Sequence, residues 1–83
     1  MLTSVKGMNK IINKEQLEFV VFCIENFADK YNLDVKKVYD AFIGNDNIIN
    51  NYIVKNYDVL HTQGKEYIVR ELKDLIDRKG IVI

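Results

Sequence analysis

Apolar residues recur at every third or fourth position along most of this 83-residue chain. Because an α-helix completes one turn in 3.6 residues, this spacing collects them on one face of a helix. Proline is absent and glycine occurs only four times, which is too few for a flexible linker or a collagen-like repeat. The pattern predicts an all-α fold, a compact bundle of about four helices.

Two helices are predicted in the first half of the chain. Asn13 can cap the first of them, with Gln16 reaching back as in a capping box, and Asn32 is the expected C-terminal turn residue. Asp34 can cap the second helix, and Gly44 stands where a left-handed C-cap would be. We expect one continuous apolar stripe of the first helix to face the core: Leu17, Val20, Val21, Ile24, Ala28 and Tyr31.

Two more helices are predicted in the second half. Asp46 can cap a third segment that points Ile48, Ile49, Tyr52, Ile53, Tyr57 and Leu60 inward. Three asparagines weaken this segment and predict a bend: Asn50, Asn51 and Asn56. Thr62 is the expected N-cap of the last helix, which buries Ile68, Leu72, Leu75 and Ile76 and ends at Gly80.

The chain is expected to form one domain. We interpret residues 1–12 as a flexible N-terminal extension, residues 13–80 as a single helical domain and residues 81–83 as an apolar C-terminal tail. The N-terminus lacks the unbroken apolar stretch of a signal peptide. The longest apolar run has six residues, whereas a membrane-spanning helix needs about 20. A cytoplasmic protein without membrane contact is therefore expected.

The charge balance argues against nucleic acid as a partner. Twelve Lys and Arg residues balance twelve Asp and Glu residues, whereas a general nucleic-acid or anionic-membrane binder needs a basic surface. A helix-turn-helix reader would place residues 46–57 in the major groove, yet this stretch carries one lysine and no arginine. A small helix-turn-helix DNA-binding regulator stays as the alternative function.

Few residues suit catalysis or metal binding. The only cysteine, Cys23, lies between Phe22 and Ile24, an apolar setting that raises the pKa of a thiol and blunts its reactivity. A Cys–His nucleophile would need Cys23 within hydrogen-bond reach of His61, the only histidine. One histidine with scattered carboxylates is a weak metal-ligand set. We therefore expect no enzyme, no catalytic residue, no metal and no cofactor, and we expect Cys23 in the core.

Two stretches carry a family resemblance, which spans about Lys14 to Lys79. Phe22-Cys23-Ile24-Glu25, followed by Tyr57-Asp58-Val59-Leu60-His61-Thr62-Gln63-Gly64, resembles the small bacterial family catalogued as domain of unknown function 3791. The resemblance implies a short helical protein with no established activity or cofactor, so no catalytic residue is carried over. Genes of this family often neighbour ones that resemble ADP-ribosyltransferases, which implies a binding partner or neutraliser of a toxin-like enzyme. The signature positions are Glu25, Tyr57, His61, Thr62 and Gly64.

The second stretch has a structural and a functional interpretation. In the structural one, Leu60 fills the core while His61 and Thr62 fasten the third helix to the fourth, and Gly64 keeps the turn free of a side chain. In the functional one, His61 and Gln63 point outward as a recognition corner. The structural signature residues are Tyr57, Leu60, Thr62 and Gly64.

The first helix predicts a binding surface. Phe22 projects away from the apolar stripe and Phe19 lies nearby, within a ring of carboxylates: Glu15, Glu18, Glu25 and Asp29. Either a chain terminus (residues 1–12 or 81–83) covers the two aromatic side chains, or they anchor a protein partner whose pocket is edged by Lys or Arg. A homodimer through the same patch is a further alternative. The sequence thus predicts a non-enzymatic protein-interaction module with these partner-binding candidates: Phe19, Phe22, Glu25, His61 and Gln63.

Overall fold

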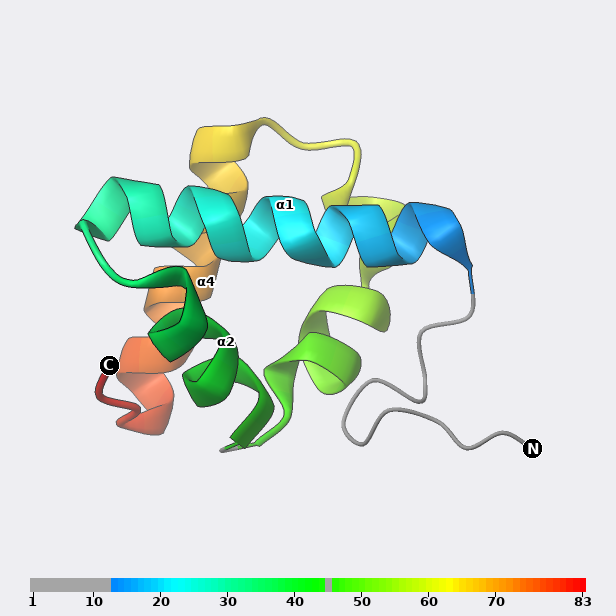
Figure 1. Cartoon of the computed structure of the whole chain (residues 1–83). Coiled ribbons are helices and arrows are strands. Elements are labelled where there is room, and N and C mark those ends of the chain that lie inside the picture. Colours follow the sequence, from blue (N-terminus) through cyan, green and yellow to red (C-terminus); the bar gives the residue numbers. More distant parts are fainter. Residues whose placement is uncertain (1–12, 45) are drawn as a thin grey trace.

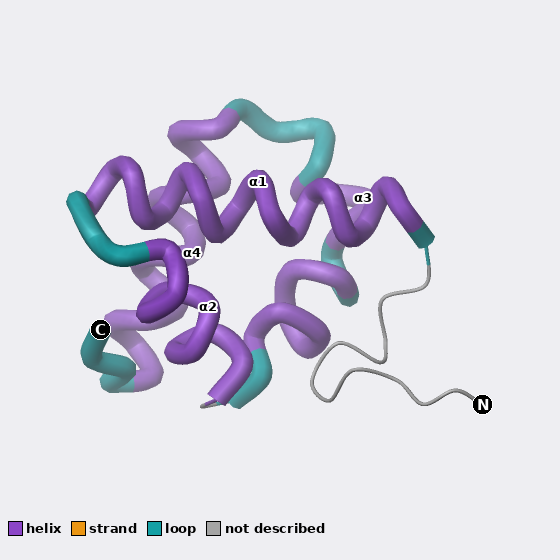
Figure 2. Tube along the Cα trace, in the orientation of Figure 1, coloured by secondary structure: helices purple, strands orange, loops and turns teal. Residues whose placement is uncertain are grey.

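The structure is a computed structural model that describes residues 13–44 and 46–83. Within these residues the fold is all-α. The elements are, in order, α1 (Lys14–Tyr31), α2 (Val35–Gly44), the π-helix η1 (Ile49–Val54), α3 (Tyr57–Leu60) and α4 (Lys65–Lys79). Figure 1 shows α1 extending across the molecule, and it packs against α2, η1 and α4. Figure 2 shows helices joined by short loops. The all-α prediction is confirmed, while residues 1–12 lie outside the described residues.

The boundaries of α1 follow the sequence prediction. The Oδ1 atom of Asn13 accepts a hydrogen bond from the backbone N–H of Gln16 at 2.8 Å, which satisfies one of the free amides of the first turn. Asn32 ends the helix with a φ of 56°, a left-handed conformation that asparagine tolerates better than most residues. Both cap predictions are confirmed.

The buried face of α1 is rotated relative to the predicted stripe. Val20, Ile24 and Ala28 are buried as expected. However, Leu17 and Val21 are each 43% exposed, and Cys23 and Phe27 are buried in their place. The first half of α1 is apolar on several sides, so the position of the neighbouring elements decides which side is covered. The prediction for Leu17 and Val21 was wrong, and the prediction of a core Cys23 is confirmed.

The start of α2 matches the prediction and its end does not. The Asp34 carboxylate accepts a hydrogen bond from the backbone N–H of Lys36 at 2.9 Å, as a capping residue does. Gly44 is the last residue of α2 and does not have a positive φ, so the left-handed C-cap assigned to it was wrong. Among the described residues of this connection, Asn47 is left-handed, with a φ of 50°.

Asp46 does not cap the third segment. Its carboxylate forms an ion pair with the Lys79 ammonium group at 2.8 Å, which ties the start of this segment to the end of α4. The neighbouring Asn47 supplies the cap instead, because its Oδ1 atom accepts from the backbone N–H of Asn50 at 3.3 Å. The amide of Asn50 also donates to Asn47 at 3.3 Å, which accommodates a polar residue that is only 4% exposed.

The predicted bend divides the third segment into η1 and α3. Asn56 lies between them, and its side-chain amide donates to the carbonyl oxygen of Tyr52 at 2.8 Å. Such a side-chain hydrogen bond competes with the regular backbone ladder of a helix. The apolar positions Ile48, Ile49, Ile53 and Leu60 are nevertheless buried as predicted.

The turn before α4 differs from the prediction at Thr62 and Gly64. The N-cap of α4 is Gly64, which has no side chain to accept a hydrogen bond, and the Thr62 hydroxyl donates backwards to the Val59 carbonyl oxygen at 2.8 Å. Gly64 has a φ of −73°, and a Cβ added there would meet no atom within 4 Å. The turn therefore does not require a glycine, and both expectations were wrong. Gly80, with a φ of 71°, ends α4 as predicted.

One apolar core joins the helices. The ring of Phe27 on α1 packs against Phe42 of α2 with centroids 5.3 Å apart, and Leu72 and Ile76 of α4 are buried in the same cluster. Leu75, predicted to be inward, is half-buried against it. At the C-terminus, Ile81 and Ile83 pack on the cluster. Within residues 13–44 and 46–83, no helix has the length and apolar character that crossing a bilayer requires.

The turn geometry predicts opposite effects for two substitutions. Gly64→Ser should raise the free energy of unfolding by a few tenths of a kcal/mol, because a serine in this extended conformation can accept from the first free amides of α4. Thr62→Ala should cost no more than about 0.5 kcal/mol, since the hydroxyl makes one exposed hydrogen bond to Val59 and does not cap α4. Urea denaturation measures both values. A loss of about 1 kcal/mol for Thr62→Ala would restore the capping role.

The burial of Cys23 predicts an inert thiol. Its side chain is fully buried, and burial raises the pKa of the thiol to about 12. Only the thiolate attacks a disulfide, so the native protein should react with Ellman's reagent at pH 8 only at the rate of its unfolding. The reaction should become fast in denaturing urea. Fast labelling of the native protein would show that the thiol is accessible.

Candidate functional site

Four rings form a continuous row from α1 to α3. Phe22 stacks on Phe19 with centroids 6.0 Å apart, and Phe19 meets the edge of Tyr57 at 5.4 Å. Tyr57 in turn stacks on His61 at 4.4 Å with an interplanar angle of 5°. We call these residues, Phe22, Phe19, Tyr57 and His61, the aromatic row. It brings together the two separate stretches of sequence that carry the family resemblance.

The ends of the aromatic row are exposed and its middle is anchored. Phe22 is 37% exposed and His61 is also exposed. Phe19 and Tyr57 are half-buried, and Phe19 packs against the core cluster. The row is therefore a surface feature held in place by the interior of the protein.

Residues 81–83 do not cover the aromatic row. The C-terminus lies at the opposite end of the molecule from the N-terminal half of α1, which carries Phe19 and Phe22 (Figure 1). The prediction that this tail covers Phe19 and Phe22 was wrong. Ile81 and Ile83 pack on the core cluster directly after the end of α4. The other predicted cover, residues 1–12, lies outside the described residues.

Helical spacing builds each half of the aromatic row. Phe19 and Phe22 are three residues apart on α1, and Tyr57 and His61 are four residues apart at α3, so each pair lies on one helix face. His61 is the C-cap of α3, and its backbone N–H donates to the Tyr57 carbonyl oxygen at 3.0 Å. Its ring atom Nδ1 lies 2.7 Å from the same oxygen. The imidazole is thus held against Tyr57 by stacking and by a hydrogen bond.

Carboxylates flank the exposed rings. Glu18 precedes Phe22 by one helical turn, Glu25 follows it by almost one turn, and both are exposed on α1. Asp58, exposed on α3, precedes His61 by one turn. The only described ion pair among these groups joins Glu18 to Lys14 at 3.7 Å, and both partners are largely exposed. Such a pair contributes little, so Glu18, Glu25 and Asp58 form an acidic margin of the row among the described residues.

The remaining signature residues have different positions. Leu60 is 5% exposed and fills the core, as predicted. Gln63 is exposed in the turn before α4, and among the described residues its side chain has no ring contact or hydrogen bond that joins it to the row. Thr62 and Gly64 lie in the same turn, where the Thr62 hydroxyl bonds to Val59 and no atom lies near a Cβ added at Gly64. The structure therefore assembles Phe19, Phe22, Tyr57 and His61, with Glu25 at the margin, and leaves Gln63 apart.

Cys23 and His61 lie in different environments. Cys23 is enclosed by the core with a raised thiol pKa, whereas His61 is exposed and bound to Tyr57. A nucleophile and its base must lie within hydrogen-bond reach of each other. Within the described part of the chain, no three His, Cys, Asp or Glu side chains are grouped so that they could hold a metal ion.

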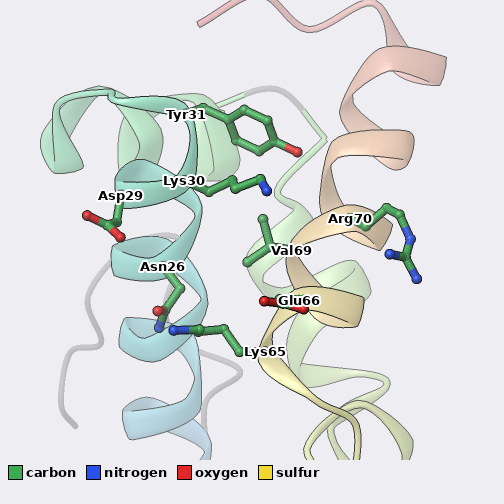
Figure 3. Close-up of a pocket in the computed structure, with 8 residues that line it drawn as sticks. All are labelled: Asn26, Asp29, Lys30, Tyr31, Lys65, Glu66, Val69 and Arg70. Carbon is green, nitrogen blue, oxygen red and sulfur yellow. The ribbon is translucent and has the colours of Figure 1, made fainter.

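A groove between α1 and α4 was not predicted from the sequence. It has a volume of roughly 480 Å³ and is lined by Asn26, Asp29, Lys30, Tyr31, Lys65, Glu66, Val69 and Arg70. Figure 3 shows Lys30 and Val69 pointing into the space between the helices, while Arg70 points away from α1. Three cationic and two anionic side chains line it, so it favours no single charge class of ligand. No motif marks these residues, because they meet only when α4 packs on α1.

Comparison with known proteins gives one match. No curated protein and no solved structure matches the chain. The model of a family described as a protein of unknown function (DUF3791) matches residues 18–79, a range that contains the whole aromatic row. The chain belongs to this family of unknown function, DUF3791.

Proposed function

We propose that this chain is a non-enzymatic protein-interaction module that binds a partner protein through the aromatic row. The observation that carries the proposal is the continuous contact from exposed Phe22, through half-buried Phe19 and Tyr57, to exposed His61. Aromatic side chains at the centre of an interface commonly dominate its binding energy. Rings that already pack against the core, as Phe19 does, or against one another lose little conformational freedom on binding, which favours affinity.

The partner that we propose is a co-encoded protein. The family resemblance implies neighbouring genes that resemble ADP-ribosyltransferases, and an antitoxin-like or regulatory partner of such an enzyme needs only a binding surface. A cytoplasmic location is part of this proposal. An exposed aromatic anchor within an acidic margin suits a partner whose pocket is edged by Lys or Arg.

A symmetric homodimer through the same patch is less favourable. Two-fold symmetry places the same patch of each copy against the other. The flanking carboxylates Glu18 and Glu25 of both copies would then lie within one interface. Like charges at an interface are repulsive, so the acidic margin favours a different protein as the partner.

The helix-turn-helix alternative has weaker support. Residues 46–57 would have to present an exposed recognition helix. In the structure this stretch contains η1, whose Ile49, Asn50 and Ile53 are buried. Lys55 is the only cationic residue of residues 46–57. Phosphate neutralisation supplies much of the affinity for DNA, and this stretch offers little of it.

Phe22→Ser should abolish partner binding while the protein stays folded. Because the ring is partly exposed, its loss should lower the free energy of unfolding by only about 1 kcal/mol. The measurement pairs urea denaturation with co-purification of the product of the adjacent gene, expressed together with this chain. Val35→Ser is the matched control, since Val35 is a 48% exposed apolar residue of α2 outside the row. A complex that survives Phe22→Ser unchanged would contradict the proposed binding surface.

The two function classes differ in their response to DNA. The purified chain should not bind DNA from its own promoter above the level of an unrelated duplex at 150 mM salt, which a mobility-shift assay measures. Tight and salt-sensitive binding to that promoter, without any protein partner, would instead support the DNA-binding regulator.

A further inference from the structure

We propose that the aromatic row recognises an arginine side chain that lies beside an apolar side chain of the partner, with Nε2 of His61 as a hydrogen-bond acceptor. This inference rests on the proposed function, because it names the chemistry of the partner for the same surface. It assigns separate roles to the two ends of the row. Phe22 receives the apolar group, and His61 with Asp58 receives the guanidinium group.

The hydrogen bond of His61 determines what the ring offers to a partner. A carbonyl oxygen can only accept, so Nδ1 of His61 carries the proton in its 2.7 Å contact with the Tyr57 carbonyl oxygen. In the neutral ring, Nε2 then has a free lone pair and is an acceptor. Stacking on Tyr57 at 4.4 Å fixes the plane of the ring. His61 is an exposed residue, and within the described part of the chain no hydrogen bond uses its Nε2 atom.

The carboxylates that flank the exposed rings are also acceptors. Glu18 and Glu25 flank Phe22 on α1, and Asp58 lies one helical turn before His61. A partner that complements this surface must therefore bring donors and positive charge, together with an apolar group for the anchor.

Arginine fits this arrangement better than lysine does. Its guanidinium group is planar, stacks on aromatic rings and presents several N–H donors in a fixed fork. One such group can donate to an imidazole nitrogen and to a carboxylate at the same time. A lysine ammonium is a compact, strongly hydrated charge without a stacking face.

The experiment selects partners from a displayed library of helical peptides, using the full chain as bait at 50 mM and at 150 mM salt. Peptides that bind the wild-type chain but not the Phe22→Ser variant are retained, because these use the aromatic row. We expect arginine to be enriched one helical turn from an apolar residue in this set. Replacing that arginine with citrulline or lysine should weaken binding by about tenfold or more.

His61→Phe tests the role of the imidazole nitrogen. Phenylalanine keeps a ring that can stack on Tyr57 but has no acceptor, so the arginine peptides should bind about tenfold more weakly. Thermal unfolding checks that the variant is folded. Gln63→Ala is the matched control, because Gln63 is exposed two residues away and belongs to no part of the row. Its peptide affinities should stay within twofold of the wild type.

The possible outcomes separate this inference from the proposed function. The inference would be overturned if the Phe22-dependent peptides were not enriched in arginine. It would also be overturned if the arginine peptides bound the His61→Phe variant and the wild type equally. Neither result would contradict the proposed interaction module. A selection without any Phe22-dependent peptide would overturn the inference, whereas the proposed function is overturned only if the complex with the co-encoded protein survives Phe22→Ser. If His61→Phe fails to fold, His61→Gln replaces it. The glutamine side chain keeps an acceptor in its amide oxygen, so this variant should bind the arginine peptides with the same preference for arginine as the wild type.

Discussion

The burial of one face of α1 is the interaction on which the rest of the structure depends. Val20, Cys23, Phe27 and their neighbours are almost completely enclosed, and the elements α2, η1 and α4 all pack on this helix. A chain of this size has little surplus of burial over conformational entropy. Because α2, η1 and α4 pack on α1 from several sides, most of the apolar side chains belong to one core. The C-terminal residues Ile81 and Ile83 pack against it as well.

The same helix also builds the candidate binding surface. Phe19 belongs to both, because it packs against the core and carries the ring contacts to Phe22 and Tyr57. The position of the exposed Phe22 ring is therefore set by its contact with Phe19, which packs on the core, and not by a loop. This arrangement also explains why a short helix such as α3 can hold His61 in a defined orientation, since the stack on Tyr57 and the hydrogen bond to its carbonyl oxygen act together.

The differences from the sequence prediction arise mainly where two neighbouring residues can perform one task. Asp46 and Asn47 are both good capping residues; Asn47 has this role, and the Asp46 carboxylate pairs with Lys79. Lys79 lies 33 positions further along the chain, so local sequence carries no sign of this pairing. In the turn before α4, the Thr62 hydroxyl donates to the Val59 carbonyl oxygen, and the N-cap residue of α4 is Gly64.

The sequence by itself determined the helical class, most helix boundaries and the interior position of Cys23. Asn13, Asn32, Asp34 and Gly80 act through bonds and backbone preferences that span only a few residues, so local sequence is enough to predict them. The tertiary structure alone decided which side of α1 is buried and that Phe19 meets Tyr57, 38 positions later (57 minus 19). These features depend on how helices pack against one another, and several sides of α1 are apolar enough to be buried.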